Sequence, residues 1–111
     1  MIKRPILLML ASMAIVSSAY SADYEPLQWQ AKAVELAKAE PKIKFASWSQ
    51  TESFWIMVDD DGTRRDHYAD YICLLTNDAG RPSGVFVAVT VWDARSATTN
   101  TPKQLGKGFC Q

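Results

Sequence analysis

One stretch of the chain gathers the residue types that perform chemistry in proteins. Between Trp55 and Cys73 stand three consecutive aspartates, a glycine, two arginines, the only histidine, His67, and one of the two cysteines. Carboxylates bind hard cations, and a histidine beside a carboxylate commonly acts as a general base. This stretch is therefore the first place to look for a metal site or an active site.

A calcium loop of the EF-hand type does not fit the spacing. With Gly62 at the sixth position of such a loop, Asp59 and Asp61 occupy the third and fifth positions. The first and twelfth positions, which need oxygen ligands, are then Met57 and Tyr68. A weak surface calcium site through the three aspartates stays open, and the chain is expected to use no metal or other cofactor.

A hydrolytic centre built on His67 lacks a nucleophile. Asp66 or Asp70 could orient the imidazole, but His67 and Asp70 fall on the polar side of the helical pattern that follows. Cys73, the nearest thiol, is expected in a disulfide. These residues indicate a surface histidine in a protein that is not an enzyme, and a small hydrolytic enzyme remains only as an alternative.

The same stretch fits the end of a strand, a turn and the start of a helix. Aspartate and glycine are turn formers, and Gly62 tolerates the positive φ of a tight turn. Thr63 and Asp66 stand at capping-box spacing, so that each side chain would accept a hydrogen bond from the other residue's main-chain N–H. The sequence therefore predicts that residues 59–62 reverse the chain and that a helix begins near Thr63.

The first 21 residues have the layout of a secretory signal peptide. Two basic residues, Lys3 and Arg4, precede the uncharged run 5–16, and small residues follow that run. Cleavage is expected after Ser21, with cleavage after Ala19 as an alternative and an uncleaved membrane anchor as the competing interpretation. Cleavage implies export to the periplasm or the cell exterior, and no membrane attachment afterwards.

Charge and cysteine content constrain the exported chain. Loss of Lys3 and Arg4 leaves ten basic against twelve acidic residues, which gives no electrostatic reason to bind nucleic acid or an anionic membrane. Cys73 and Cys110 both remain, 37 positions apart, and an even pair in an exported chain is expected to form one disulfide. That crosslink should contribute about 4 kcal/mol, a large share of the stability of a small domain.

Hydrophobic periodicity predicts the element order α-β-β-α-β for a domain that spans residues 22–92. Helices are expected over 25–40 and from about 63 to 77, and strands over 43–49, 53–58 and 85–92. In the first strand, Ile43 and Phe45 should share one face and Trp48 should take the other. Residues 93–111 are polar and are expected to form a tail that is tied back through Cys110.

These elements fit a small α+β domain with a three-stranded, mainly antiparallel sheet, two helices on one face and one disulfide. The first two strands should form an antiparallel hairpin, because only a short polar turn joins them. The preferred strand order is 2-1-3, which makes every neighbouring pair antiparallel. Insertion of the third strand beside the second is the alternative, and either arrangement requires a right-handed crossover.

The sheet face without helices carries the functional prediction. Trp55 and Met57 share one face of the second strand, and Phe86 and Trp92 alternate with valines in the third. Monomers rarely leave a contiguous apolar patch of more than a few hundred Å² in water. The sequence therefore predicts a non-enzymatic binding domain that docks a protein partner or a second copy through these four residues. One alternative is that the tail covers part of this face. Another is that the protein is a structural or membrane-anchored component of the cell envelope.

Overall fold

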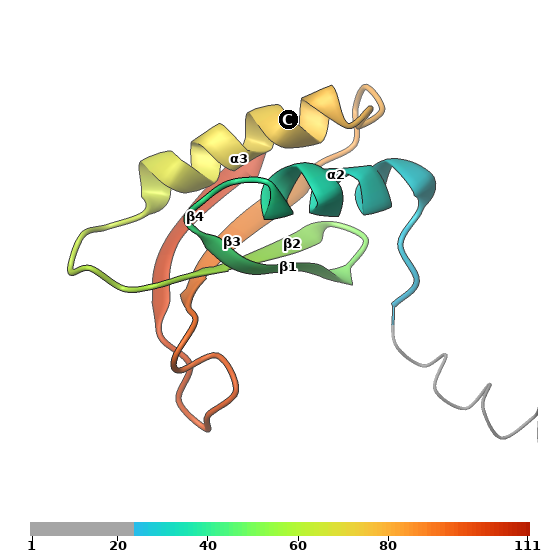
Figure 1. Cartoon of the computed structure of the whole chain (residues 1–111). Coiled ribbons are helices and arrows are strands. Elements are labelled where there is room, and N and C mark those ends of the chain that lie inside the picture. Colours follow the sequence, from blue (N-terminus) through green and yellow to red (C-terminus); the bar gives the residue numbers. More distant parts are fainter. Residues whose placement is uncertain (1–23) are drawn as a thin grey trace, which may run out of the picture.

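The computed structural model describes residues 24–111, so the predicted signal peptide lies outside the described part. The described chain forms two layers, a four-stranded sheet and two helices on one of its faces (Figure 1). Neither helix in residues 24–111 has the length and apolar character that crossing a bilayer requires. The elements are α2 (Gln28–Lys38), β1 (Ile43–Gln50), β2 (Ser53–Val58), α3 (Asp66–Asp78), β3 (Val87–Asp93) and β4 (Gln104–Cys110).

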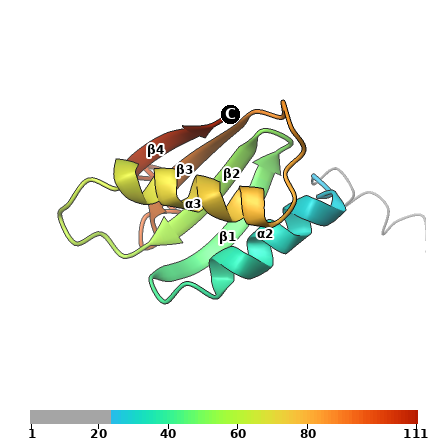
Figure 2. The ribbon, with the colours of Figure 1, turned by 90° about the horizontal axis from the view of Figure 1, so that it is seen from above.

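The sheet has the strand order β1-β2-β3-β4, so the expected three strands in the order 2-1-3 are wrong. β1 and β2 form the expected antiparallel hairpin, whereas β3 lies parallel to β2 after the crossover through α3. β4 then pairs antiparallel with β3, and it comes from the segment predicted to be a polar tail. This order makes the apolar β3 an interior strand that is paired on both edges (Figure 2).

Two glycines bring β4 directly against α3. A Cβ at position 106 would lie 2.3 Å from the main-chain carbonyl carbon of Arg65, and one at position 108 would lie 2.6 Å from an Asp70 carboxylate oxygen. Glycine is unfavourable in strands, so the sequence Gly106-Lys107-Gly108 favours a loop when only the sequence is considered. In the fold, the missing side chains allow the strand and the helix to touch.

The core lies between the helices and the sheet. Trp48 of β1 stacks on Phe54 with ring centroids 4.4 Å apart, and it meets Trp29 of α2 edge to face at 5.4 Å. The indole N–H of Trp48 donates to the main-chain carbonyl of Gln30 at 2.9 Å, which holds α2 on β1. The other large core residues are fully buried and come from β2, α3 and β3: Ile56, Val58, Ile72, Val87, Val89 and Val91.

A β-bulge in β1 changes which of its side chains face the core. The register of β1 against β2 shifts between Ile43 and Phe45, because Lys44 is an extra residue there. Ile43 and Trp48 are consequently both buried under the helices, whereas Phe45 is 61% exposed on the opposite face. The prediction that Ile43 and Phe45 share a face is therefore wrong.

The acidic loop makes the predicted turn without the predicted capping box. Gly62 has a φ of 89°, the left-handed conformation that a tight turn needs. Thr63 donates from its N–H and its hydroxyl to the Asp61 carboxylate, at 3.1 and 2.6 Å. α3 begins at Asp66, whose carboxylate accepts the main-chain N–H of Lys107 at 2.9 Å. That carboxylate ties α3 to β4 instead of capping the helix.

Acid is expected to weaken the contact between α3 and β4. Hydrogen bonds from the Arg64 side chain and from the main chain of Lys107 hold the pKa of Asp66 below its ordinary value. A carboxyl of this kind contributes stability above its unfolded pKa, about 3.9, and loses that contribution as the pH falls through its lower folded pKa. Asp66 should therefore add a loss of stability below about pH 4.

Thermal unfolding of the wild type and of Asp66→Asn across this pH range checks the prediction. The asparagine variant should be less stable at neutral pH, and its melting temperature should depend less on pH between about 2 and 4. Equal pH profiles for the two proteins would show that the Asp66 carboxylate does not stabilise the fold.

Candidate interaction surface

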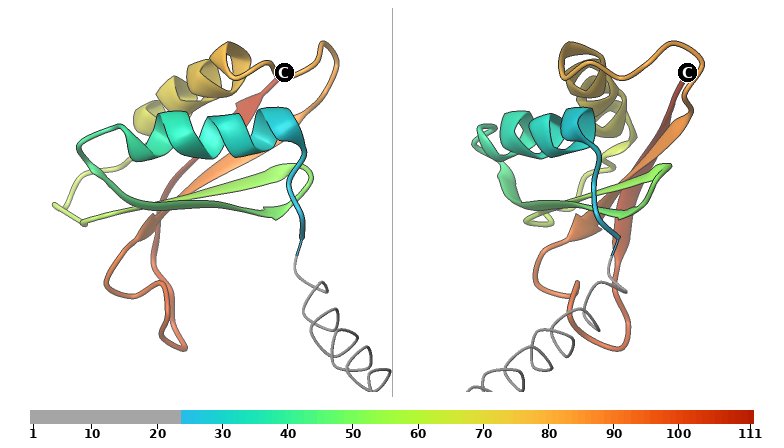
Figure 3. Two further views of the ribbon diagram at one scale, coloured as in Figure 1. Left: turned by 45° about the vertical axis from the view of Figure 1, so that its right-hand side comes forward. Right: turned by 90° about the vertical axis from the view of Figure 1, so that its right-hand side faces the viewer.

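The face of the sheet turned away from the helices, here called the open face, carries three of the four predicted residues at its centre. Trp55 and Met57 of β2 lie on it, opposite the buried side of that strand. The β2–β3 register places Trp92 beside Met57, and the Trp55 and Trp92 rings meet edge to face with centroids 5.4 Å apart. Figure 3 shows both helices on the other side of the sheet.

Phe86, the fourth predicted residue, belongs to the β4 end of this surface. It lies just before β3, and its ring stacks on Phe109 of β4 with centroids 5.9 Å apart. Both rings are exposed, Phe86 by 38% and Phe109 by 57%. The ammonium of Lys107 lies 5.5 Å from the Phe109 ring centre, in the range of a cation–π contact. Phe109 was missed by the sequence prediction because it stands in the supposed tail.

The loop that joins β3 to β4, residues 94–103, covers the centre of the open face. It projects on the side away from the helices, and hydrogen bonds among its own residues hold its shape (Figure 1). Ala97 and Pro102 of this loop close a small pocket of about 50 Å³ over Trp55, Met57 and Trp92, which are half-buried. The loop leaves the aromatic groups at the two ends of the open face exposed.

The β1 end of the open face is hollowed. Phe45 lies there because of the bulge at Lys44, which no sequence signal revealed. Lys38 of α2 is the charged residue of this groove, and it makes no ion pair within residues 24–111. The groove has a volume of about 330 Å³ and is lined by Lys38, Phe45, Ala46, Ser47, Met57, Ala94, Ala97 and Thr98.

The aspartates of the acidic loop make structural contacts. Asp60 pairs with Lys103 at 2.7 Å, and Asp61 lies 3.4 Å from the guanidinium of Arg65. Arg65 is buried and also donates to the main-chain carbonyl of Asp59 at 3.2 Å. Among the residues that the structure describes, no three or more histidine, cysteine, aspartate or glutamate side chains gather as a metal site would require.

A hydrolytic centre on His67 was left by the sequence only as an alternative to a surface histidine. His67 and Asp70 are both exposed on α3, as the polar pattern of that helix indicates. Cys73, one turn further on, is bonded to Cys110, and the described chain contains no free cysteine. No thiol nucleophile is therefore available to this histidine within residues 24–111.

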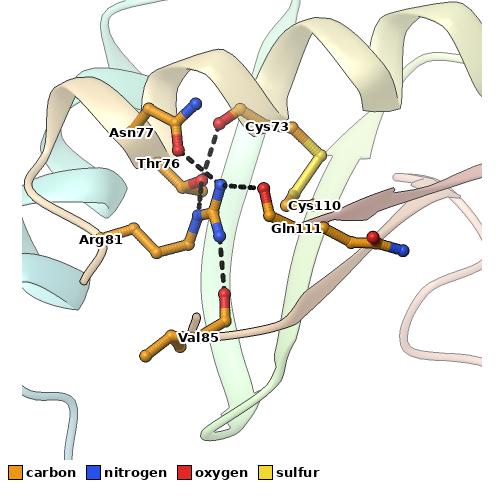
Figure 4. The surroundings of a disulfide bond; sticks show 7 residues. All are labelled: Cys73, Thr76, Asn77, Arg81, Val85, Cys110 and Gln111. Carbon is orange, nitrogen blue, oxygen red and sulfur yellow. Dashed lines mark hydrogen bonds between the residues drawn. A yellow bond between two sulfur atoms is a disulfide. The ribbon is translucent and has the colours of Figure 1, made fainter. Parts of the chain in front are cut away.

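The predicted disulfide is present and joins α3 to β4 (Figure 4). It links Cys73 of the helix to Cys110, the last residue of the strand. Arg81 lies beside it and donates to the main-chain oxygens of Val85 and Gln111, at 2.6 and 3.3 Å. The covalent and hydrogen-bonded links together fix the end of β4, and with it the position of the neighbouring phenylalanine on the open face.

Comparisons of the chain with protein-family models, with curated proteins and with solved structures found no match.

Proposed function

We propose that the protein is a small exported binding protein, without enzymatic activity, that docks a protein partner on its open face. The exposure of aromatic rings at both ends of that face is the observation that supports this most. Phe45 is 61% exposed at the β1 end and Phe109 57% exposed at the β4 end, with the stacked Phe86 beside it. Aromatic groups are enriched at the cores of protein interfaces, where they contribute much of the binding energy.

The arrangement between these ends supports one continuous surface. Trp55 and Trp92 pack on each other at the centre, and the loop above them leaves them half-buried. A partner that contacts both ends would therefore also contact the loop, whose residues are mostly small or polar and include the cations Arg95 and Lys103. Such an interface would join two exposed aromatic patches, one at each end of the face, through the more polar loop between them.

Export is the second part of the proposal. The Cys73–Cys110 disulfide supports it, because such bonds form and persist in oxidising compartments such as the periplasm and the cell exterior. The signal-peptide layout of residues 1–21 supports it independently. Intact-mass measurement on protein from the periplasm or the medium distinguishes cleavage after Ser21 from the alternative, an envelope component anchored by an uncleaved N-terminus.

Two substitutions at the ends of the open face test the docking proposal. Phe45→Ser and Phe109→Ser should lower the free energy of unfolding by no more than about 1 kcal/mol, because both rings are exposed and Phe109 contributes only its stacking on Phe86. Each should weaken binding to the protein that co-purifies with the wild type by about tenfold or more. If the partner is a second copy, sedimentation equilibrium measures the same loss.

Leu74→Ser is the matched control, because Leu74 is 57% exposed on α3, on the other side of the molecule. It should leave binding unchanged. Weakened binding in the Leu74 variant alone, or a strictly monomeric wild type with no recoverable partner, would refute docking on the open face. Trp55→Ala and Trp92→Ala discriminate less well, because both residues also pack beneath the loop.

A further inference from the structure

The two edges of the sheet differ in how they are covered. At the β4 edge, the main-chain carbonyl of Leu105 accepts the N–H of Arg65 at 2.9 Å, and the N–H of Lys107 donates to the Asp66 carboxylate at 2.9 Å. The residues at the start of α3 therefore occupy the Leu105–Lys107 part of this edge, which limits pairing with another chain to its Cys110 end. β1 forms the opposite edge of the sheet.

The hydrogen-bond pattern shows which main-chain groups of β1 point outward. The main-chain N–H of Ala88 in β3 donates to the carbonyl of Glu52, and that of Ala94, just after β3, donates to the carbonyl of Val58, each at 2.8 Å. The even-numbered residues of β2 therefore form their main-chain hydrogen bonds with β3. The odd-numbered residues of β2 therefore bond with β1, where their direct partners are also odd-numbered. The N–H and C=O groups of Ala46 and Trp48 consequently point outward, and no described residue hydrogen-bonds to them.

The groove lies next to these free groups. Phe45, Ala46 and Ser47 line it from β1, and Met57 and the loop line it from the open face. A strand added at this edge would project every second side chain over the open face, beside the groove. Register shifts at both ends of β1 limit its regular part to residues 45–48, so the edge suits a short segment.

The position of α2 indicates whether a second copy of the chain or a segment of another protein, a foreign segment, would bind at the β1 edge. Figure 2 shows α2 running beside β1 at this edge of the sheet. Antiparallel pairing of two β1 strands would bring the α2 helices of both copies together on the same side of the joined sheet. A foreign segment avoids this crowding, and a carboxylate on it would neutralise Lys38, which has no ion-pair partner in the described chain.

We propose that the free edge of β1 receives a short extended segment of the partner protein, as a fifth strand of the sheet. The segment bonds to the outward groups of Ala46 and Trp48, places an apolar side chain in the groove beside Phe45, and sets a carboxylate against Lys38. This inference rests on the proposed function, because it specifies how a partner docks at the β1 end of the open face.

The test uses a displayed library of random peptides, selected on the exported protein purified from the cells that produce it. Enriched peptides should carry an acidic residue close to an apolar one. When a synthetic copy of one such peptide binds, hydrogen exchange at the amides of Ala46 and Trp48 should slow. Failure to enrich any peptide, or protection confined to another part of the chain, would overturn the proposal.

A matched pair of charge reversals on α2 makes the test specific. Lys38→Glu should weaken peptide binding tenfold or more, whereas Lys32→Glu, an equal change of charge on the same helix, should alter it less than twofold. Ala46→Pro should abolish binding, because it removes an outward N–H without removing a bond to β2. If that variant does not fold, the two lysine variants still decide.

The outcomes separate this inference from the proposed function. Equal loss of peptide binding in the two lysine variants, or none in either, overturns docking at the β1 edge. If Phe109→Ser still weakens binding of the natural partner in that case, docking on the open face stands. Protection of Ala46 and Trp48 in a dimer of the protein alone would instead identify a second copy as the occupant, and would also overturn the inference.

Discussion

Replacement of both Cys73 and Cys110 by alanine is expected to lower the free energy of unfolding by about 4 kcal/mol. The bond closes a loop with a sequence separation of 37, and the crosslink removes the entropy of that loop from the unfolded chain. Small domains have a total stability of about 5–15 kcal/mol, so the loss should be a large fraction of it. Urea unfolding of both proteins at neutral pH, without reductant, measures the difference.

Reductant provides the control for this prediction. It should shift the urea midpoint of the wild type to that of the double variant, and it should leave the variant unchanged. The variant should keep its folded spectrum in the absence of urea, since β4 still pairs with β3 and Arg81 still binds the end of the chain. Equal midpoints for wild type and variant would show that the crosslink contributes no stability.

Gly106→Ala is expected to destabilise the domain by about 3 kcal/mol, the upper end of the range for overpacking. The new Cβ would lie 2.3 Å from the carbonyl carbon of Arg65 and 2.5 Å from the main-chain nitrogen of Asp66. These are main-chain atoms, so no rotation of a side chain relieves the clash. α3 would have to move away from β4, which would break the hydrogen bond from Arg65 to Leu105.

Two neighbouring substitutions in β4 serve as comparisons. Gly108→Ala should cost less, about 1 kcal/mol, because the nearest neighbour of the new Cβ is an oxygen of the exposed Asp70 side chain, which can move, and the fixed atoms of Ala69 are 3.1 Å away, well beyond the 2.3 Å contact at position 106. Lys107→Ala should change stability by less than about 0.5 kcal/mol, because that side chain is exposed. Urea unfolding ranks the three variants. A Gly106 variant as stable as the Lys107 variant would mean that α3 does not contact β4 as described.

These glycines also explain why the fourth strand could not be predicted from the sequence. Strand propensity depends on side chains that pack, and β4 instead presents Gly106 and Gly108 to α3. The hairpin and α3 were predictable, since alternating residues such as Phe54 and Ile56, and the helical spacing around Ile72, report burial directly. The position of β3 was not, because a right-handed crossover allows it beside either strand of the hairpin.

The candidate surface was predictable where strands keep a regular alternation. Trp55 and Met57 follow from the uninterrupted pattern of β2, and Trp92 follows from that of β3. Phe45 was assigned to the wrong face because the bulge at Lys44 depends on pairing with β2, which the sequence of β1 alone does not specify. Phe109 and the groove depend in turn on β4 and on the loop that precedes it.

Site-specific crosslinking in the producing cells tests binding through the open face most directly. A photoreactive phenylalanine analogue would replace Phe45, Phe109 or Leu74, which have nearly equal exposure of 61%, 57% and 57%. Docking on the open face predicts crosslinks to the same protein from positions 45 and 109 and none from position 74 on α3. Crosslinks from position 74 alone, or from none of the three positions, would contradict it.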